Sequence, residues 1–185
     1  MSFDVRNMMP FVRRLAVIAT LGALTAGCFQ PMYAQSTTTG GEGLRDKLSA
    51  VDIREIKVLP KDARLGVEVR NGLLFNFTGG SSPAAPTHEL LVSMSSSRAA
   101  TIVDPVTSRA DVENYGIDVS YVLKEVVTGK VVVTGATFAR VSYDIPGQEQ
   151  RFARARGLRD AETRATKVIA DNLSQRLASY FVAGT

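Results

Sequence analysis

The stretch YGIDVSYVLKEVVTGKVVVTGATFARVSYD, residues 115–144, decides the fold, because it has the pattern of two strands joined by a tight turn. Apolar and polar side chains alternate from Tyr115 to Lys124, which gives the first strand one apolar face and one mostly polar face. Residues 127–130, VTGK, supply the turn, and the chain returns in a second apolar-rich arm. Gly135 inside that arm predicts a bulge or bend. The hairpin therefore predicts a sheet with one face turned toward a core.

The chain before the hairpin predicts a strand, a helix and a second strand. VDIREIKVLP, residues 51–60, alternates around one register slip and reads as a strand. Residues 62–80 change to a helical period, with Asp62 as a plausible N-cap and a Gly-Gly pair as the stop. Its apolar face recurs every fourth residue, at Leu65, Val69, Leu73 and Phe77. HELLVSMSSS, residues 88–97, returns to strand, and we expect a loop with Arg98, Pro105 and Arg109 after it.

The chain after the hairpin is helical to its end, because apolar residues recur at steps of three to five. These residues are Leu158, Ala161, Ala165, Val168, Leu173, Leu177 and Phe181. The element order β-α-β-β-β-α predicts an α+β fold, with two helices packed on one face of a roughly four-stranded mixed or antiparallel sheet. We expect Leu73 and Leu177 to lie where the two helices meet that sheet.

The N-terminus has the pattern of an export leader. Arginines precede an uncharged run, Leu15 to Gly27, which is too short to span a bilayer. The run ends in LTAGC, and Cys28 is the only cysteine in the 185 residues. This ending resembles the lipobox of bacterial lipoproteins, in which the cysteine is acylated and becomes the mature N-terminus. An ordinary signal peptide with an incidental buried cysteine is the alternative, and Met1, Met8 or Met9 could each be the start.

Residues 1–27 are thus predicted to be a lipoprotein signal peptide, residues 28–48 a lipidated tether, and residues 49–185 a single domain. The segment after Cys28 is rich in Ser, Thr and Gly, which is typical of a flexible spacer. Its first apolar residues could instead dock on a partner or on the lipid surface. Phe29 is not the Asp that retains such lipoproteins at the inner membrane, so the resemblance implies the periplasmic side of the outer membrane.

Catalytic constellations are missing from the sequence. His88 is the only histidine, and a polar residue at a loop edge is the favoured interpretation of it. Zinc sites, Cys–His dyads and Ser–His–Asp triads therefore lack parts. Glycine-rich nucleotide-binding patterns do not occur. We expect a protein that is not an enzyme and that has no metal and no cofactor.

One basic segment stands out near the start of the last helix. Export makes nucleic acid an improbable partner for it, and we expect none. A solvated helix start, compensated by Asp160 and Glu162, is the favoured interpretation, with docking of an anionic glycolipid or a partner as the alternative. The segment contains Arg151, Arg154, Arg156, Arg159 and Arg164.

Several strings resemble the LptE family of lipopolysaccharide-assembly lipoproteins in its alphaproteobacterial form. CFQPMY resembles the family's opening after the lipobox, although the usual Gly after Cys28 is absent. RLGVEVRNGLLFNF resembles its first helix, YVLKEVVTGKVVVTGATFARVSYD its hairpin, and RDAETRATKVIADNLSQRLASYF its last helix. The resemblance covers nearly the whole mature chain, and its specificity lies in the combination of these strings.

The resemblance implies a small α/β domain inside the outer-membrane barrel LptD, where the pair inserts lipopolysaccharide into the outer leaflet. The chain would plug the barrel, help to assemble it, bind lipopolysaccharide and break no bond. A free-standing periplasmic lipoprotein that binds a small lipid for another transport system is the alternative. Because lipid A carries phosphates, basic residues at strand ends and turns are the candidate contacts. These are Arg98, Arg109, Lys124 and Lys130, unless they are ordinary solubilising charges.

Overall fold

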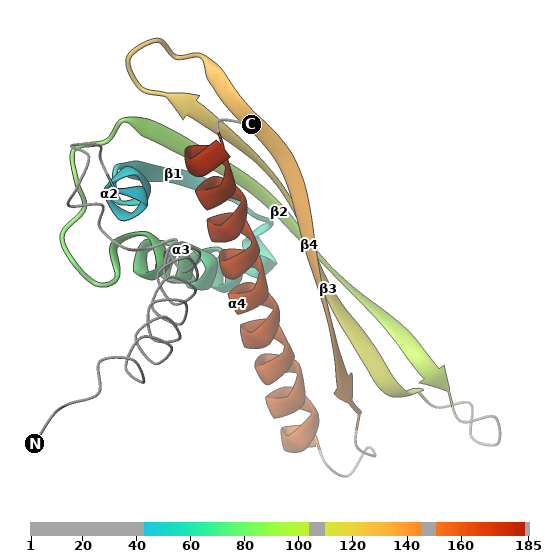
Figure 1. Cartoon of the computed structure of the whole chain (residues 1–185). Coiled ribbons are helices and arrows are strands. Elements are labelled where there is room, and N and C mark those ends of the chain that lie inside the picture. Colours follow the sequence, from blue (N-terminus) through green and yellow to red (C-terminus); the bar gives the residue numbers. More distant parts are fainter. Residues whose placement is uncertain (1–42, 104–109, 146–150, 184–185) are drawn as a thin grey trace, which may run out of the picture.

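The structure is a computed structural model, and it describes residues 43–103, 110–145 and 151–183 (Figure 1). Its elements are α2 (Leu44–Ser49), β1 (Val51–Lys57), the 3₁₀ turn η1 (Pro60–Asp62), α3 (Ala63–Thr78), β2 (His88–Val103), β3 (Ala110–Glu125), β4 (Val131–Asp144) and α4 (Arg151–Ala183). The four strands form one sheet in the order β1-β2-β3-β4. β1 pairs with β2 in parallel, and the other two pairs are antiparallel. The predicted α+β fold with a mixed four-stranded sheet is confirmed.

The register slip predicted in the first strand is present. β1 pairs with β2 through an irregularity between Ile53 and Glu55. Val51 and Ile53 are buried before the slip, and the residues after it are more exposed. The slip therefore divides β1 into a buried half and a charged half.

β2 is longer than predicted, and this corrects the placement of Arg98. The strand continues beyond the expected end at residue 97, and Arg98 pairs with Tyr115 inside the β2–β3 ladder. β2 and β3 have 16 residues each, so β3 offers backbone partners well past the apolar part of β2. A ladder satisfies backbone groups whatever the side chains are, which is why a polar stretch stays extended.

The bulge or bend predicted at Gly135 is absent, because Gly135 pairs in register with Tyr121. The irregularity lies closer to the turn, between the pairs that Leu123 and Lys124 make with β4. Gly135 has a different reason to be glycine. A Cβ placed there would lie 2.6 Å from the Tyr121 hydroxyl oxygen, so the glycine makes room for the ring.

The predicted helical face of α3 is confirmed, since Leu65, Val69, Leu73 and Phe77 are all buried. The helix ends at Gly79, whose φ of 62° lies in the left-handed region that glycine adopts without strain. Asp62 stands at the N-cap position, but its side chain makes no capping hydrogen bond. It instead accepts a hydrogen bond of 2.8 Å from the Ser96 hydroxyl of β2.

The predicted face of α4 is mostly confirmed, with one error. Val168 is 41% exposed, and the neighbouring Ile169 is fully buried in its place. A step of four from Ala165 follows the helical period of 3.6 more closely than the step of three to Val168. Leu173 and Leu177 continue the buried face, as predicted.

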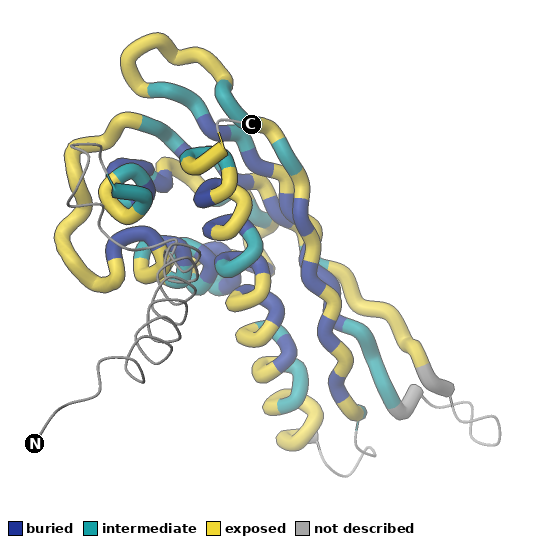
Figure 2. Tube along the Cα trace, in the orientation of Figure 1, coloured by how far each residue is buried: buried dark blue, intermediate teal, exposed yellow. Residues whose placement is uncertain are grey.

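The helices of the described residues all lie on one side of the sheet (Figure 1). Side chains on the odd-numbered positions of β3 from Tyr115 to Leu123 are buried against this helical layer. Figure 2 shows the resulting alternation of buried and exposed residues along the strands. No helix or strand among the described residues covers the other side, which we call the bare face.

α2 corrects the predicted start of the domain at residue 49. Leu48 is only 2% exposed and belongs to the core. Arg45 donates a hydrogen bond to the Thr78 carbonyl at 3.4 Å, which ties α2 to the end of α3. Residues 44–48, which were predicted as tether, therefore belong to the described fold.

Candidate functional site

The four residues predicted to bind lipopolysaccharide do not form one cluster. Arg98 has the same parity as the buried residues of β2, so it lies on the helical side of the sheet. Lys124 has the opposite parity to the buried residues of β3, so it lies on the bare face. The register places Arg98 opposite Tyr115, which is nine positions, or ~30 Å, from Lys124. Lys130 follows the β3–β4 turn at the Lys124 end, and Arg109 lies outside the described residues.

Arg98 lies beside a polar cluster that the sequence did not reveal, formed by Glu113, Tyr143 and Arg154. The Tyr143 hydroxyl donates a hydrogen bond to the Glu113 carboxylate, and Arg154 Nη2 lies 3.5 Å from Glu113 Oε1. Burial and the Glu113 carboxylate raise the pKa of Tyr143 to about 12, while Arg98 acts weakly in the opposite direction. Two guanidinium groups thus lie at this end of the sheet, Arg154 beside Glu113 and Arg98 beside Tyr143. Guanidinium groups bind anionic groups such as phosphate well.

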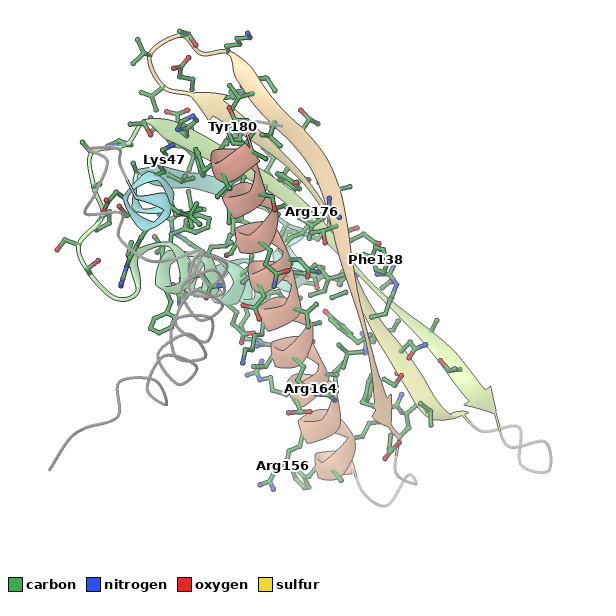
Figure 3. The ribbon with its side chains drawn as sticks, in the orientation of Figure 1. Lys47, Phe138, Arg156, Arg164, Arg176 and Tyr180 are labelled. Atoms are coloured by element: carbon green, nitrogen blue, oxygen red, sulfur yellow. The ribbon has the colours of Figure 1, made fainter. Side chains whose placement is uncertain are left out.

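The basic start of α4 is compensated in a different way from the prediction. Asp160 does pair with Arg164, at 2.7 Å. Glu162 pairs with Arg64 of α3 instead, so it joins the two helices rather than neutralising its own. Arg164 also donates to the Ser142 carbonyl of β4 at 3.3 Å. Figure 3 shows Arg156 and Arg164 on this part of α4.

A shallow groove of about 430 Å³ separates the start of α4 from the end of β4. Its lining residues are Ser142, Tyr143, Asp144, Ala153, Gly157, Asp160 and Arg164. The groove adjoins the Glu113–Tyr143–Arg154 cluster through Tyr143. The predicted site residue Arg98 and the basic segment of α4 therefore belong to the same end of the molecule.

The bare face of the sheet carries hydroxyl groups, an ion pair and one exposed aromatic ring. It carries a row of small hydroxyl side chains on β2, at Ser93, Ser95 and Ser97. The exposed pair Arg140–Asp118, at 2.6 Å, balances its own charge. Arg140 also lies over the ring of the exposed Phe138, with its Cζ 5.3 Å from the ring centroid. A surface of this kind suits a hydrated neighbour better than lipid.

His88 lies at the start of β2, at the edge of the loop that precedes the strand. Its ring packs edge-on against Phe181 of α4, with 5.2 Å between centroids, and Nδ1 lies 2.9 Å from the Thr87 hydroxyl. Burial lowers the pKa of the imidazole below its usual value.

Among the described residues, no group of three or more His, Cys, Asp and Glu is placed to hold a metal ion. In the same part of the chain, no helix has the length and apolarity needed to cross a bilayer.

Solved structures share this fold, although no protein-family model and no curated protein matches the chain. A candidate lipoprotein from Caulobacter crescentus is 19% identical with a TM-score of 0.58, over 78% of this chain and 98% of its own. The rare lipoprotein B from Shewanella oneidensis is 18% identical with a TM-score of 0.53, over 72% and 96%. A lipoprotein B from Nitrosomonas europaea is 12% identical with a TM-score of 0.51, over 78% and 94%.

These matches span nearly the whole of the other chains, so the shared architecture is that of the entire domain and not of one motif. At identities below 20% these structural matches show the fold alone, so the role of individual residues must be argued from the geometry of this chain. The described part of the chain has the one-sided α+β fold that these lipoproteins share.

Proposed function

We propose that the chain is a lipid-anchored outer-membrane protein of the LptE type, in its alphaproteobacterial form, that plugs the LptD barrel, assists its assembly and binds lipopolysaccharide. It acts by binding and breaks no bond. The observation that carries the proposal is the combination of a lipobox cysteine with a domain whose fold is shared with three proteins described as lipoproteins. The local likenesses to the LptE family in the two helices and the hairpin agree with it.

The predicted anchor follows from the leader. Cys28 lies outside the described residues, as does most of the predicted tether. A single acyl chain binds membranes only marginally, whereas a multiply acylated cysteine gives a durable attachment. Mass spectrometry of the membrane form tests this step, since a mature N-terminus other than acylated Cys28 would contradict it.

The bare face supports the plug role. The lumen of an outer-membrane barrel is polar, and the bare face offers hydroxyl groups and a self-balanced ion pair rather than an apolar surface. The core is formed on the other side, so contacts on the bare face cost no core packing. This surface can therefore face the hydrated inner wall of a barrel while the hydrophobic core stays covered.

The decisive experiment is extraction of the membrane form in a mild detergent, followed by purification through a tag on this chain. A stable one-to-one complex with LptD supports the proposal. A free monomer that retains a small lipid would contradict it and favour an auxiliary lipoprotein of another transport system. The Cys28→Ala variant, released from the membrane, controls for detergent artefacts because its folded part is unchanged.

A further inference from the structure

β4 forms one edge of the sheet, and the pairing pattern fixes which of its backbone groups face outward. The Glu125 N–H donates to the Lys130 carbonyl, and the Val126 N–H donates to the Thr87 carbonyl, both at 2.9 Å. Odd-numbered residues of β3 thus bond toward β4, and even-numbered ones toward β2. Through the β3–β4 register, the even-numbered residues of β4 direct their N–H and C=O groups away from the sheet.

A side-chain contact agrees with this assignment. Arg164 reaches the Ser142 carbonyl from outside the sheet, at 3.3 Å. No such side-chain donor is found, within the described residues, for the outward carbonyls of Ala136, Phe138 and Arg140. The middle of β4 therefore presents a row of free donors and acceptors at the spacing of a sheet.

The two edge strands of the sheet, β1 and β4, differ in the features that prevent a further strand from pairing with them. Short strands, charged side chains and irregular pairing discourage the addition of a further strand. β1 has all three, because it has seven residues, an irregularity after Ile53, and charges at Arg54, Glu55 and Lys57. β4 has 14 residues, and its pairing from Leu123↔Val133 to Val112↔Asp144 is regular. Its middle carries no proline and only one charge, Arg140, which is already paired with Asp118.

A groove of about 610 Å³ runs between this free edge and α4. Figure 3 shows Phe138 on β4 and Arg176 on α4, at the two sides of this region. The lining residues are Ala136, Thr137, Phe138, Asn172, Gln175, Arg176 and Ser179. They include one cation and no carboxylate, and no ion pair is found for Arg176 in the described part of the chain.

We propose that the middle of β4 accepts an extended acidic segment of a partner protein, which adds to the sheet as a fifth strand. The segment bonds to the outward groups of Ala136, Phe138 and Arg140, as in other cases of strand addition. Its helix-side carboxylates pair with Arg176, and an apolar side chain on its other face contacts the exposed Phe138 ring. This docking mode goes beyond the proposed function, because it depends neither on lipopolysaccharide nor on a particular barrel.

Charge argues against a second copy of this chain as the occupant. An antiparallel pairing of β4 with β4 centred near Phe138 would bring both Arg176 side chains to one seam that has no carboxylate. Two guanidinium groups held close together without a carboxylate repel each other. An acidic segment meets the same seam with the opposite charge.

The test uses the full lipidated chain in detergent micelles and two fluorescein-labelled, capped decapeptides, TVEVTVEVTV and TVKVTVKVTV. The expected result, by fluorescence anisotropy, is at least tenfold tighter binding of the glutamate peptide than of the lysine peptide. Hydrogen exchange should slow at the amides of Ala136, Phe138 and Arg140. Equal affinity for the two peptides, or no slowing at these amides, would overturn the proposal.

Two matched pairs of variants separate strand addition from general attraction. Ala136→Pro removes an outward N–H inside the groove, and Ser142→Pro removes one outside it, so only the first should abolish binding. Arg176→Glu should weaken the glutamate peptide at least tenfold, whereas Arg159→Glu, an equal charge change elsewhere on α4, should not. Equal losses of peptide binding within either pair would contradict the proposal. So would a dimer of the wild type in sedimentation velocity that becomes monomeric in Ala136→Pro, because that outcome assigns the edge to a second copy.

Discussion

The ring of Tyr121 lies across Gly135 of the neighbouring strand, close enough that a Cβ at Gly135 would fall 2.6 Å from the phenol oxygen and 2.7 Å from Cζ. The ring covers a place where the strand offers no side chain of its own. The glycine thus gains a packing partner and the Tyr121 ring becomes buried. The tyrosine requires a residue without a side chain at position 135, and the glycine leaves the space that the ring fills.

Gly135→Ala is expected to lower the free energy of unfolding by about 1–3 kcal/mol, because the new methyl group overpacks the site. Urea unfolding measures the change. In a Tyr121→Leu background the same substitution should cost clearly less, since the ring is gone. Gly157→Ala is the control of opposite sign: the Cβ there meets its nearest atom at 3.5 Å, and alanine favours the helix by roughly 0.5–1 kcal/mol.

Leu73→Ala and Leu177→Ala should each destabilise the domain by about 2–5 kcal/mol, because both side chains are fully buried between the helices and the sheet. Val67→Ala on α3 is the control, since Val67 is 58% exposed and should change stability by no more than about 0.5 kcal/mol. Chemical unfolding of the three variants measures this. Near-neutral results at both leucines would contradict the packing described above.

His88 should make the stability fall as the solution is acidified. Burial lowers its pKa in the folded state below the ordinary 6.5, so the unfolded chain binds the proton more readily. The contribution is complete above pH 6.5 and is lost as the pH falls through the folded pKa. The melting temperature of the wild type should therefore drop between pH 7.5 and 5.5 more steeply than that of His88→Gln. Parallel slopes for the two proteins would rule out this role for the imidazole.

The proposed lipopolysaccharide contact can be tested separately at the two ends of the sheet. Arg98 stands with Arg154 at one end, and Lys124 with Lys130 at the other. The first end has the denser group of cations, so Arg98→Ser with Arg154→Ser should weaken binding to lipopolysaccharide by about tenfold or more, since a hydrogen bond to a charged group contributes roughly 1.5–3 kcal/mol.

Lys124→Ser with Lys130→Ser is the matched control, because it removes the same number of charges at the other end. It should have the smaller effect, and circular dichroism should show that both variants keep the fold. A larger loss in the lysine pair would move the contact to the hairpin turn. Arg109→Ser, combined with either pair, tests the fourth predicted residue.

The sequence was informative where side-chain burial follows one simple period. The alternation from Tyr115 to Leu123 and the four-residue spacing from Leu65 to Phe77 both reproduce the buried faces. The sequence pattern gave wrong predictions where backbone pairing, or a residue distant in the chain, determines the local structure. Arg98 is held in a strand by the β3 backbone, and Gly135 is required by a ring fourteen positions earlier in the chain.

The candidate sites were harder to predict than the fold, for the same reason. Glu113, Tyr143 and Arg154 come from two strands and a helix, and no local pattern connects them. The open edge of β4 depends on strand order, which the hairpin alone leaves undecided. Single residues such as Arg98 and Lys124 could be named as cations, but their separation could be known only once the register was fixed.

Because the described helices cover only one side of the sheet, the residues on its two faces are under different structural constraints. Side chains under the helices are tied to one another, so a change at one position requires changes at its neighbours. On the bare face some side chains are paired, as Arg140 is with Asp118 and Ser142 with Asn114, whereas Ser95 and Ser120 make no side-chain hydrogen bond within the described residues. Substitutions on the bare face are therefore constrained mainly by the partner that contacts it. Relatives can keep the architecture while few positions keep the same residue. Interfaces on the bare face should therefore diverge together with their partners, faster than the domain that carries them.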